Sequence, residues 1–217
     1  MYNFAVELKF IILKKFNISS STSIKFMADN AFITTKNNKG NEIKLIPSST
    51  IKGVLRSSMI RIAYALGFND VIPSIHPEKI GKAKDIVVSI FGKPGEDFSK
   101  IKIENAYYDG DTQTLAHVRI NDKRGVAEEG GLFTIEYIPI GEKFLTKMVC
   151  NHLSIEEVRA LFGALANLRY ERIGRGSLVN VKIVRILPKK VEEEFKKDDV
   201  VKLLLDALIN KDEGDIF

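Results

Sequence analysis

Apolar and polar residues alternate along the first part of the chain. Val6, Leu8 and Phe10 fall on one side of an extended segment within residues 2–16, and this period of two predicts a β-strand. The pattern then dissolves into serines and polar turn residues over positions 19–41. A connection of this length inside a compact domain is usually functional or disordered, so this loop is a place to look for a site.

A period near 3.6 residues begins after Pro47. Residues 43–46 form a short apolar strand before it, and Pro47 ends that strand. The apolar positions that follow predict an amphipathic helix over residues 48–66, with Ser48 or Ser49 as its N-cap.

The rest of the chain alternates strands and helices. The predicted elements are a helix at 85–91, strands at 101–108, 115–120, 132–138, 144–150 and 178–187, and helices at 154–170 and 191–210. The central order of strand, helix, strand, strand, helix and strand indicates a ferredoxin-like α+β fold, the frame also used by RNA-recognition domains. Residues 109–131 are polar and contain several glycines, which predicts a protruding β-hairpin.

Composition bounds the domain organisation. With 217 residues, 45% of them apolar, the chain can bury a core in one elaborate domain over residues 1–190, followed by an acidic helix and tail over 191–217. No apolar stretch approaches the ~20 residues of a membrane span, and no signal-peptide pattern opens the chain. We therefore expect a cytoplasmic protein. The single cysteine, Cys150, lies in an apolar strand pattern and is interpreted as buried packing.

The net charge of +5 combines two unlike parts. Residues 191–217 hold nine acidic side chains and four lysines, so the first 190 residues carry a surplus of +10. Such a surplus displaces counterions from phosphates and favours a nucleic-acid partner. Lysine-rich sequences also occur in thermophilic proteins for stability alone.

Two turns have the composition of phosphate-binding sites. At the predicted helix start, Ser48, Ser49 and Thr50 offer hydroxyls and backbone N–H groups, and Lys52 adds a positive charge. An ordinary capped helix has the same composition. The second turn contains Arg172, Gly174, Arg175 and Gly176, and its glycines permit close approach to a phosphate or sugar. A plain helix-to-strand connection is the alternative there.

The predicted hairpin carries the cationic residues Arg119, Lys123 and Arg124. A solvated loop explains them equally well. Its length suggests an element that reaches away from the domain, with an apolar residue such as Val126 able to wedge between nucleotides.

Few residues have the arrangement of a catalytic centre. The three histidines, His76, His117 and His152, form no His-x3-His pair, and no Cys-x2-Cys accompanies His76 as a zinc deaminase requires. A histidine acting as general base for RNA cleavage stays open. Asp29 is an isolated carboxylate of the long loop, where an aspartate is normally a turn former.

Several segments, in the same order, resemble the RAMP superfamily of CRISPR-associated proteins. Residues 46–56 resemble its "IPGSSLKGxLR" signature, with Arg56 at the end; residues 90–92 resemble "LFG"; residues 118–127 resemble the thumb segment "IDRxTGxA"; residues 131–144 resemble "LFxxExVPxGxxF"; and residues 174–176 resemble the glycine loop. The pattern is most similar to the repeated backbone subunit of type III (Csm/Cmr) effector complexes. Two departures are serines at 19–21 in place of a glycine pair and Ala31 in place of proline.

The resemblance implies a function. Such subunits stack along CRISPR RNA, in contact with copies of themselves and with other type III subunits, and push a thumb through the guide-target duplex. Asp29 stands where the family has the aspartate for metal-dependent cleavage of target RNA, so the resemblance implies Asp29 as catalytic residue and as ligand of a weakly held Mg²⁺ or Mn²⁺ ion. It also implies RNA contacts for a set of residues: Ser48, Ser49, Thr50, Lys52, Arg56, Arg119, Lys123, Arg124, Arg172, Gly174, Arg175 and Gly176.

Two other functions fit the same resemblance. A structural subunit would grip RNA without cutting it. A stand-alone endoribonuclease would process CRISPR transcripts with a histidine, without metal.

Overall fold

A computed structural model describes residues 1–19, 29–37, 39–71, 85–93, 98–174 and 176–209. Of the sequence-predicted residues, Arg175 and His76 lie outside this part.

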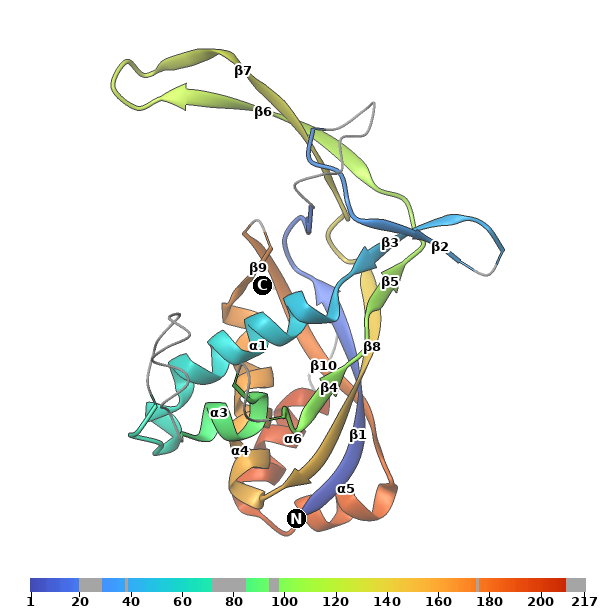
Figure 1. Cartoon of the computed structure of the whole chain (residues 1–217), viewed down its shortest axis with the longest axis vertical. Coiled ribbons are helices and arrows are strands. Elements are labelled where there is room, and N and C mark those ends of the chain that lie inside the picture. The colour runs from blue at the N-terminus through green and yellow to red at the C-terminus, as the bar shows by residue number, and fades with distance from the viewer. Residues whose placement is uncertain (20–28, 38, 72–84, 94–97, 175, 210–217) are drawn as a thin grey trace.

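A five-stranded antiparallel sheet forms the body of the protein (Figure 1). Its strands are β1 (Tyr2–Ile12), β4 (Ile101–Ile103), β8 (Lys143–Leu153), β9 (Arg172–Ile173) and β10 (Ser177–Leu187). Their spatial order is β4-β8-β1-β10-β9. Helix α1 (Ser48–Ile62) follows β1 in the chain, and helix α4 (Ile155–Asn167) follows β8. This order of strands and helices is ferredoxin-like, so the predicted α+β class is confirmed.

The core lies between the sheet and its helices. Even-numbered side chains of β1 from Phe4 to Ile12 are buried, as the alternation predicts. Phe4 packs edge-on against Phe162 of α4 and Phe195, with ring centroids 5.0 to 6.2 Å apart. Cys150 is also buried in this core, as predicted.

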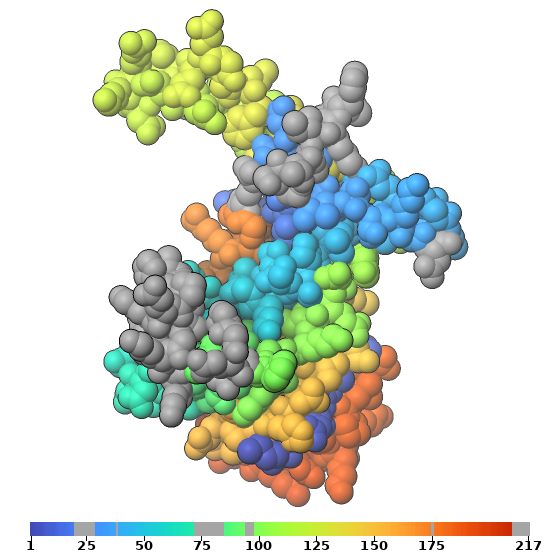
Figure 2. Space-filling view, viewed as in Figure 1, coloured from blue at the N-terminus to red at the C-terminus, as the bar shows by residue number. Residues whose placement is uncertain are grey.

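Two smaller sheets lie beyond one end of the body. A three-stranded sheet has the order β2-β3-β5, with β2 at Thr34–Lys36, β3 at Glu42–Ile46 and β5 at Ala106–Tyr108. Strands β6 (Gln113–Asn121) and β7 (Val126–Tyr137) form a two-stranded hairpin. In Figures 1 and 2 the hairpin extends to one side of the molecule and the β2-β3-β5 sheet to the other. The protruding hairpin predicted at 109–131 is therefore present and starts and ends a few residues later.

Three predicted elements differ from the structure. The single strand expected at 101–108 divides into β4 and β5, which belong to different sheets. The acidic helix expected at 191–210 is two helices, α5 (Lys189–Phe195) and α6 (Asp199–Ile209). The helix expected over residues 48–66 ends as a 3₁₀ turn, η1 (Tyr64–Leu66). A second 3₁₀ turn, η2 (Leu168–Tyr170), follows α4.

The start of α1 also differs from the prediction. Pro47 occupies the N-cap position, and both Ser48 and Ser49 are inside the helix. The Ser48 N–H donates instead to Asn105 Oδ1 at 2.8 Å. A side chain distant in sequence thus replaces the local cap, which sequence patterns near the helix could not indicate.

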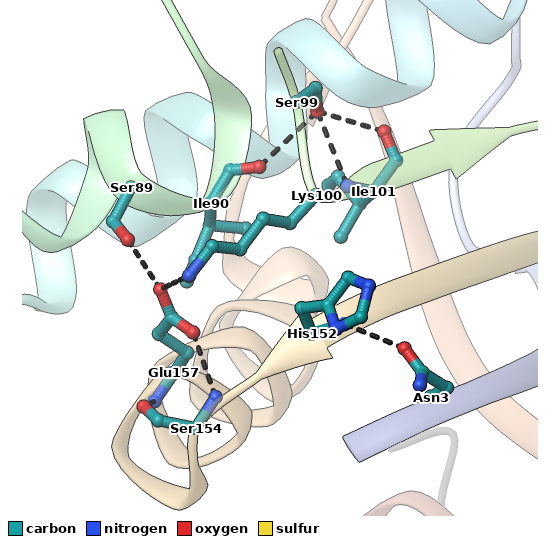
Figure 3. Close-up of polar contacts among 9 residues, drawn as sticks. All are labelled: Asn3, Ser89, Ile90, Ser99, Lys100, Ile101, His152, Ser154 and Glu157. Carbon is teal, nitrogen blue, oxygen red and sulfur yellow. Dashed lines mark hydrogen bonds and ion pairs between the residues drawn. The ribbon is translucent and has the colours of Figure 1, made fainter. Parts of the chain in front are cut away.

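A buried polar network joins the short helix α3 (Ile86–Phe91) to β4 and α4 (Figure 3). Lys100 Nζ lies 2.6 Å from Glu157 Oε1, and the Ser89 hydroxyl donates to the same oxygen. Glu157 Oε2 accepts from the Ser154 N–H at 2.8 Å and completes the capping box of α4. The network ties three elements together at the end of the body opposite to the hairpin.

In the described part of the chain, no helix is long and apolar enough to span a membrane.

Candidate RNA-binding and catalytic site

Asp29 is fixed to the base of the hairpin. Its Oδ2 accepts hydrogen bonds from the Thr134 N–H at 2.6 Å and from Thr134 Oγ1 at 3.0 Å. The Asn30 N–H donates to the Thr134 carbonyl at 3.1 Å, and Asn30 forms a parallel bridge with Ile135. The segment that carries Asp29 is therefore attached to β7 by an isolated β-bridge and by these hydrogen bonds.

The Asp29 carboxylate is exposed and ionised. Hydrogen bonds from the backbone and side chain of Thr134 lower its pKa below the ordinary value of 3.8, against a smaller opposing effect of burial. A carboxylate of low pKa is a weak base at neutral pH, so it suits binding a cation or orienting a hydroxyl better than abstracting a proton.

A second carboxylate, which is buried, stabilises the base of the hairpin. Glu136 of β7 is 8% exposed and lies 2.7 Å from Lys44 Nζ of β3. It also accepts from Thr112 Oγ1 at 2.6 Å and from the Phe32 N–H at 2.9 Å. Burial raises the pKa of Glu136, but these three partners together outweigh burial, and the pKa is lowered. The hairpin, the small sheet and the Asp29 segment are thereby locked together.

A hollow of 330 Å³ lies beside the Asp29 segment. It is lined by Asn30, Arg119, Gly130, Gly131 and Phe133. The register of the hairpin shifts between Val118 and Ile120, so that β7 bulges opposite Arg119. The structure thus brings one predicted RNA-binding cation, Arg119, close to the chain segment that holds Asp29.

The glycine turn contacts Asn17, and Asn17 in turn contacts β7. Gly174 has a φ of +61°, and a Cβ there would lie 2.2 Å from the Asn17 carbonyl oxygen. Asn17 also donates two hydrogen bonds. Its backbone N–H donates to Ser177 Oγ at 3.2 Å, and its Nδ2 donates to the Glu136 carbonyl at 2.5 Å. The predicted Gly174 is therefore required by a close backbone approach.

Asn17 has one polar atom without a partner. Its Oδ1 is buried and accepts no hydrogen bond from the part of the chain that the structure describes. An unsatisfied buried acceptor is costly, and this one lies where the glycine turn, the Asp29 segment and β7 meet.

The start of α1 provides the remaining predicted contacts. Ser49 is exposed, whereas Ser48, Thr50, Lys52 and Arg56 are half-buried. Burial and the neighbouring charge of Arg56, four residues along the helix, lower the pKa of Lys52. Two cations on one helix face attract an anion. Arg56 also has a structural contact, because its Nη1 donates to the Gly92 carbonyl at 3.3 Å.

A model of the RAMP superfamily matches residues 27–179, which is more than half of the chain. The chain belongs to the RAMP superfamily. Its fold is similar to a chain of the Type III-B Cmr-beta complex in the apo state, with a TM-score of 0.60 at 13% identity over 84% of this chain and 98% of that one. It is also similar to a chain of the Type III-B Cmr-beta complex bound to cognate target RNA, with a TM-score of 0.57, 15% identity and the same coverage. A search of curated proteins found no match.

The other predicted residues of this RAMP protein are on the hairpin tip and in the glycine turn. Lys123 and Arg124 are exposed at the hairpin tip, where Asn121 Oδ1 accepts from both of their backbone N–H groups at 3.1 Å. Arg172 is exposed on β9, and Gly176, with a φ of +84°, completes the glycine turn. Their contacts with RNA stay predictions.

Neither of the two histidines in the described part of the chain makes a hydrogen bond with Asp29, and a catalytic role for a histidine stays a prediction. The ring of His117 stacks on Phe133 of the hairpin, with centroids 5.4 Å apart. His152 lies at the end of β8 beside the N-terminus of the chain, where its N–H donates to Asn3 Oδ1 at 2.8 Å (Figure 3).

The donor set fits a weakly held metal ion. Mg²⁺ binds in many sites through one or two carboxylates and completes its shell with substrate phosphates and water. Asp29 offers one ionised, exposed carboxylate, and no group of three or more His, Cys, Asp or Glu able to hold a metal occurs among the described residues.

Sequence reasoning missed the residues that position this site. Thr134, Glu136, Lys44 and Asn17 supply most of its hydrogen bonds, but none was singled out. Thr134 and Glu136 fall within the family-like run at 131–144, where the motif's own glutamate coincides with Glu136. The glutamate of the motif was therefore the feature of the sequence that could have identified Glu136. Nothing in the sequence near Asn17 marks it.

Proposed function

We propose that this protein is an RNA-binding subunit of a type III interference complex that cleaves bound target RNA with Asp29. The observation that carries the proposal is the fixed position of the Asp29 carboxylate at the base of a protruding hairpin. Membership of the RAMP superfamily and the fold shared with chains of Cmr-beta complexes support it.

Guide RNA would lie along the basic side of the domain. The start of α1, with Lys52 and Arg56, and the turn at Gly174 and Gly176 would contact its backbone. The hairpin would reach between guide and target strands, with Val126, which is 56% exposed near the tip, as the apolar wedge. Copies of the chain and other type III subunits would be its partners along the RNA.

Cleavage would occur in the hollow between Arg119 and the Asp29 segment. The 2′-hydroxyl oxygen of the nucleotide held there attacks the adjacent phosphorus, and the bond from phosphorus to the 5′ oxygen breaks. The products are a cyclic phosphate and a free 5′-hydroxyl, which takes up a proton as the attacking hydroxyl loses one. Arg119 would neutralise charge on the phosphate, and Asp29 would orient the hydroxyl.

Asp29 would also hold a divalent cation, Mg²⁺ or Mn²⁺, which when bound stabilises negative charge on phosphate oxygens. Its low pKa keeps the carboxylate available as a ligand at neutral pH.

The test uses the complex assembled with guide and target RNA. Asp29→Asn preserves the size of the side chain and an acceptor for Thr134, and removes the negative charge. We expect assembly and target binding to be retained and cleavage in Mg²⁺ to be lost. Cleavage at the wild-type rate by Asp29→Asn would remove Asp29 from the mechanism.

A subunit that binds RNA without cutting it is the second candidate. It is compatible with the finding that the described residues contain no group of three or more His, Cys, Asp or Glu able to hold a metal. In that case the wild-type complex leaves bound target intact in both Mg²⁺ and Mn²⁺.

A further inference from the structure

The small sheet β2-β3-β5 has two different faces. On its inner face, Lys44 pairs with Glu136, and Tyr108 is buried with its hydroxyl donating to the Asp111 carbonyl at 3.1 Å. Strand register places Leu45 opposite Tyr107, on the other face. Because side chains alternate along a strand, Thr35, Ile43, Leu45 and Tyr107 share the outer face.

Tyr107 presents its ring at this outer face. It is 50% exposed, and no other ring and no cation lies against it among the described residues. Its neighbour Tyr108 is fixed on the reverse side, so the backbone that carries Tyr107 is held in place. A rigid aromatic ring offers contact area at a low entropic cost.

A hollow of 690 Å³ opens in front of this ring. It is lined by three residues of the outer face (Thr35, Ile43 and Tyr107), by Lys36 and Glu42 at the ends of β2 and β3, by the turn residues Asn37, Lys39 and Asn41, and by Asp109. The turn is internally braced, since Asn37 Oδ1 accepts from the Lys39 and Asn41 N–H groups, each at 2.9 Å. The hollow therefore exists before any ligand arrives.

The charges around the hollow are balanced. Lys36 and Lys39 face Glu42 and Asp109, so it has no net attraction for phosphate. A planar group with hydrogen-bond donors at its edge suits it better, because the ring provides a stacking surface and Asp109 provides an acceptor. Unpaired nucleobases have this form.

The small sheet adjoins the start of α1. Strand β3 ends at Ile46 and leads through Pro47 into α1. Asn105, which precedes β5, holds the Ser48 N–H. A strand of RNA bound at the start of α1 therefore meets the small sheet next.

We propose that the outer face of the β2-β3-β5 sheet is a stacking site for an unpaired base of bound RNA, with Tyr107 as its platform. The inference rests on the proposed RNA-binding function and adds a site to it. Asp109 favours bases with an exocyclic amino group, such as cytosine and adenine, over uracil, which lacks one.

The test measures binding of short fluorescent oligocytidine and oligouridine RNAs to the full chain over a range of KCl concentrations. Tyr107→Ala removes the ring and Tyr107→Phe keeps it. Tyr64→Ala is the matched control, because Tyr64 is 69% exposed in the η1 turn after α1, away from the small sheet. Thermal unfolding verifies that each variant is folded.

We expect Tyr107→Ala to weaken oligocytidine binding roughly 5- to 100-fold, the range for loss of one stacked base. The slope of affinity against salt should stay at the wild-type value, because no phosphate contact is lost. Tyr107→Phe and Tyr64→Ala should bind within about twofold of wild type. Wild type should bind oligocytidine more tightly than oligouridine.

Other outcomes overturn the inference in distinguishable ways. Unchanged binding by Tyr107→Ala eliminates the stacking site and leaves the proposed function intact. If Tyr107→Ala changes only the oligomeric state in light scattering, the face is a protein interface and the inference is wrong. If wild type binds neither RNA, the proposed RNA-binding function is wrong, and the stacking site that rests on it is wrong with it.

Discussion

Thr134 holds Asp29 through both its backbone and its side chain. The N–H and Oγ1 of Thr134 reach the same carboxylate oxygen, at 2.6 and 3.0 Å, and the Asp29 N–H donates back to Thr134 Oγ1 at 3.1 Å. Asp29 is therefore oriented by β7, although 105 positions separate the two residues.

Replacing Thr134 tests this orientation. Thr134→Val keeps the shape and the backbone bond and loses the hydroxyl, which lets the pKa of Asp29 rise toward its ordinary value. We expect target cleavage by the assembled complex to slow about 10- to 100-fold, as for other small displacements of reacting groups. Thr134→Ser should restore the rate, and RNA affinity should be unchanged in both variants. Equal rates for Thr134→Val and wild type would show that the hydroxyl has no role.

The glycine turn offers a matched pair of substitutions. Gly174→Ala places a methyl group against the Asn17 carbonyl at a positive φ, whereas a methyl group at Gly176 meets no atom within 4 Å. We expect Gly176→Ala to lower the free energy of unfolding by about 1 kcal/mol from its φ alone. Gly174→Ala should cost more than twice that and should also weaken RNA binding. Urea unfolding and RNA titration of both variants measure these effects, and equal losses would contradict the close approach at Gly174.

The contacts of Asn17 predict which of two substitutions at this position destabilises the protein more. Asn17→Ala removes the donor to the Glu136 carbonyl and should lower the free energy of unfolding by about 1–3 kcal/mol. Asn17→Asp introduces a carboxylate against the carbonyl oxygens of Glu136 and Asn30, which accept from Nδ2 in the native protein. It should therefore be less stable than Asn17→Ala at neutral pH. Urea unfolding at neutral pH provides the comparison, and the reverse order would disprove the assigned orientation of the amide.

The network of Lys100 and Glu157 predicts how stability depends on pH. Burial raises the pKa of Glu157, but Lys100, Ser89 and the Ser154 N–H together lower it below the ordinary 4.5. A lowered folded-state pKa stabilises the protein above the unfolded pKa, and this contribution is lost as pH falls through the folded value. Stability from this group should therefore be constant at neutral pH and should decrease below about pH 4.5.

Lys100→Met leaves the buried Glu157 without its cation. We expect a loss of about 2–4 kcal/mol at neutral pH. The loss should shrink as pH falls, because the protonated carboxyl of Glu157 no longer needs a cation. Adding Glu157→Gln to Lys100→Met should recover part of the loss, since glutamine retains the capping box. Urea unfolding followed by circular dichroism at neutral and at acidic pH measures all three proteins, and an equal loss for Lys100→Met at both pH values would contradict the role of the ion pair.

Local patterns predicted the elements that depend on neighbours in sequence. The period of two in β1 and the helix that begins near residue 154 were visible directly, and both are present. The N-cap of α1 was wrong because Asn105, distant in sequence, supplies the acceptor. The division of residues 101–108 into β4 and β5 depends on which strand each half pairs with, and a run of apolar residues does not encode that choice.

Prediction of the candidate site was limited in the same way. Asp29, the glycine turn and the hairpin were found through resemblance to family motifs. The contacts that join them, from Thr134, Glu136 and Asn17, span more than 100 positions. Only the fold brings these residues together.

The contacts of Glu136 hold the base of the hairpin in place, so a movement of the tip is transmitted to that base. Its base is fixed to the Asp29 segment and to the small sheet, while its tip carries exposed residues from Lys123 to Val126. A force applied to the tip by a bound duplex would be transmitted along two paired strands to the hydrogen bonds of Asp29. Under the proposed function, contact of RNA with the tip would therefore be felt at the carboxylate, although no described residue of the tip touches Asp29.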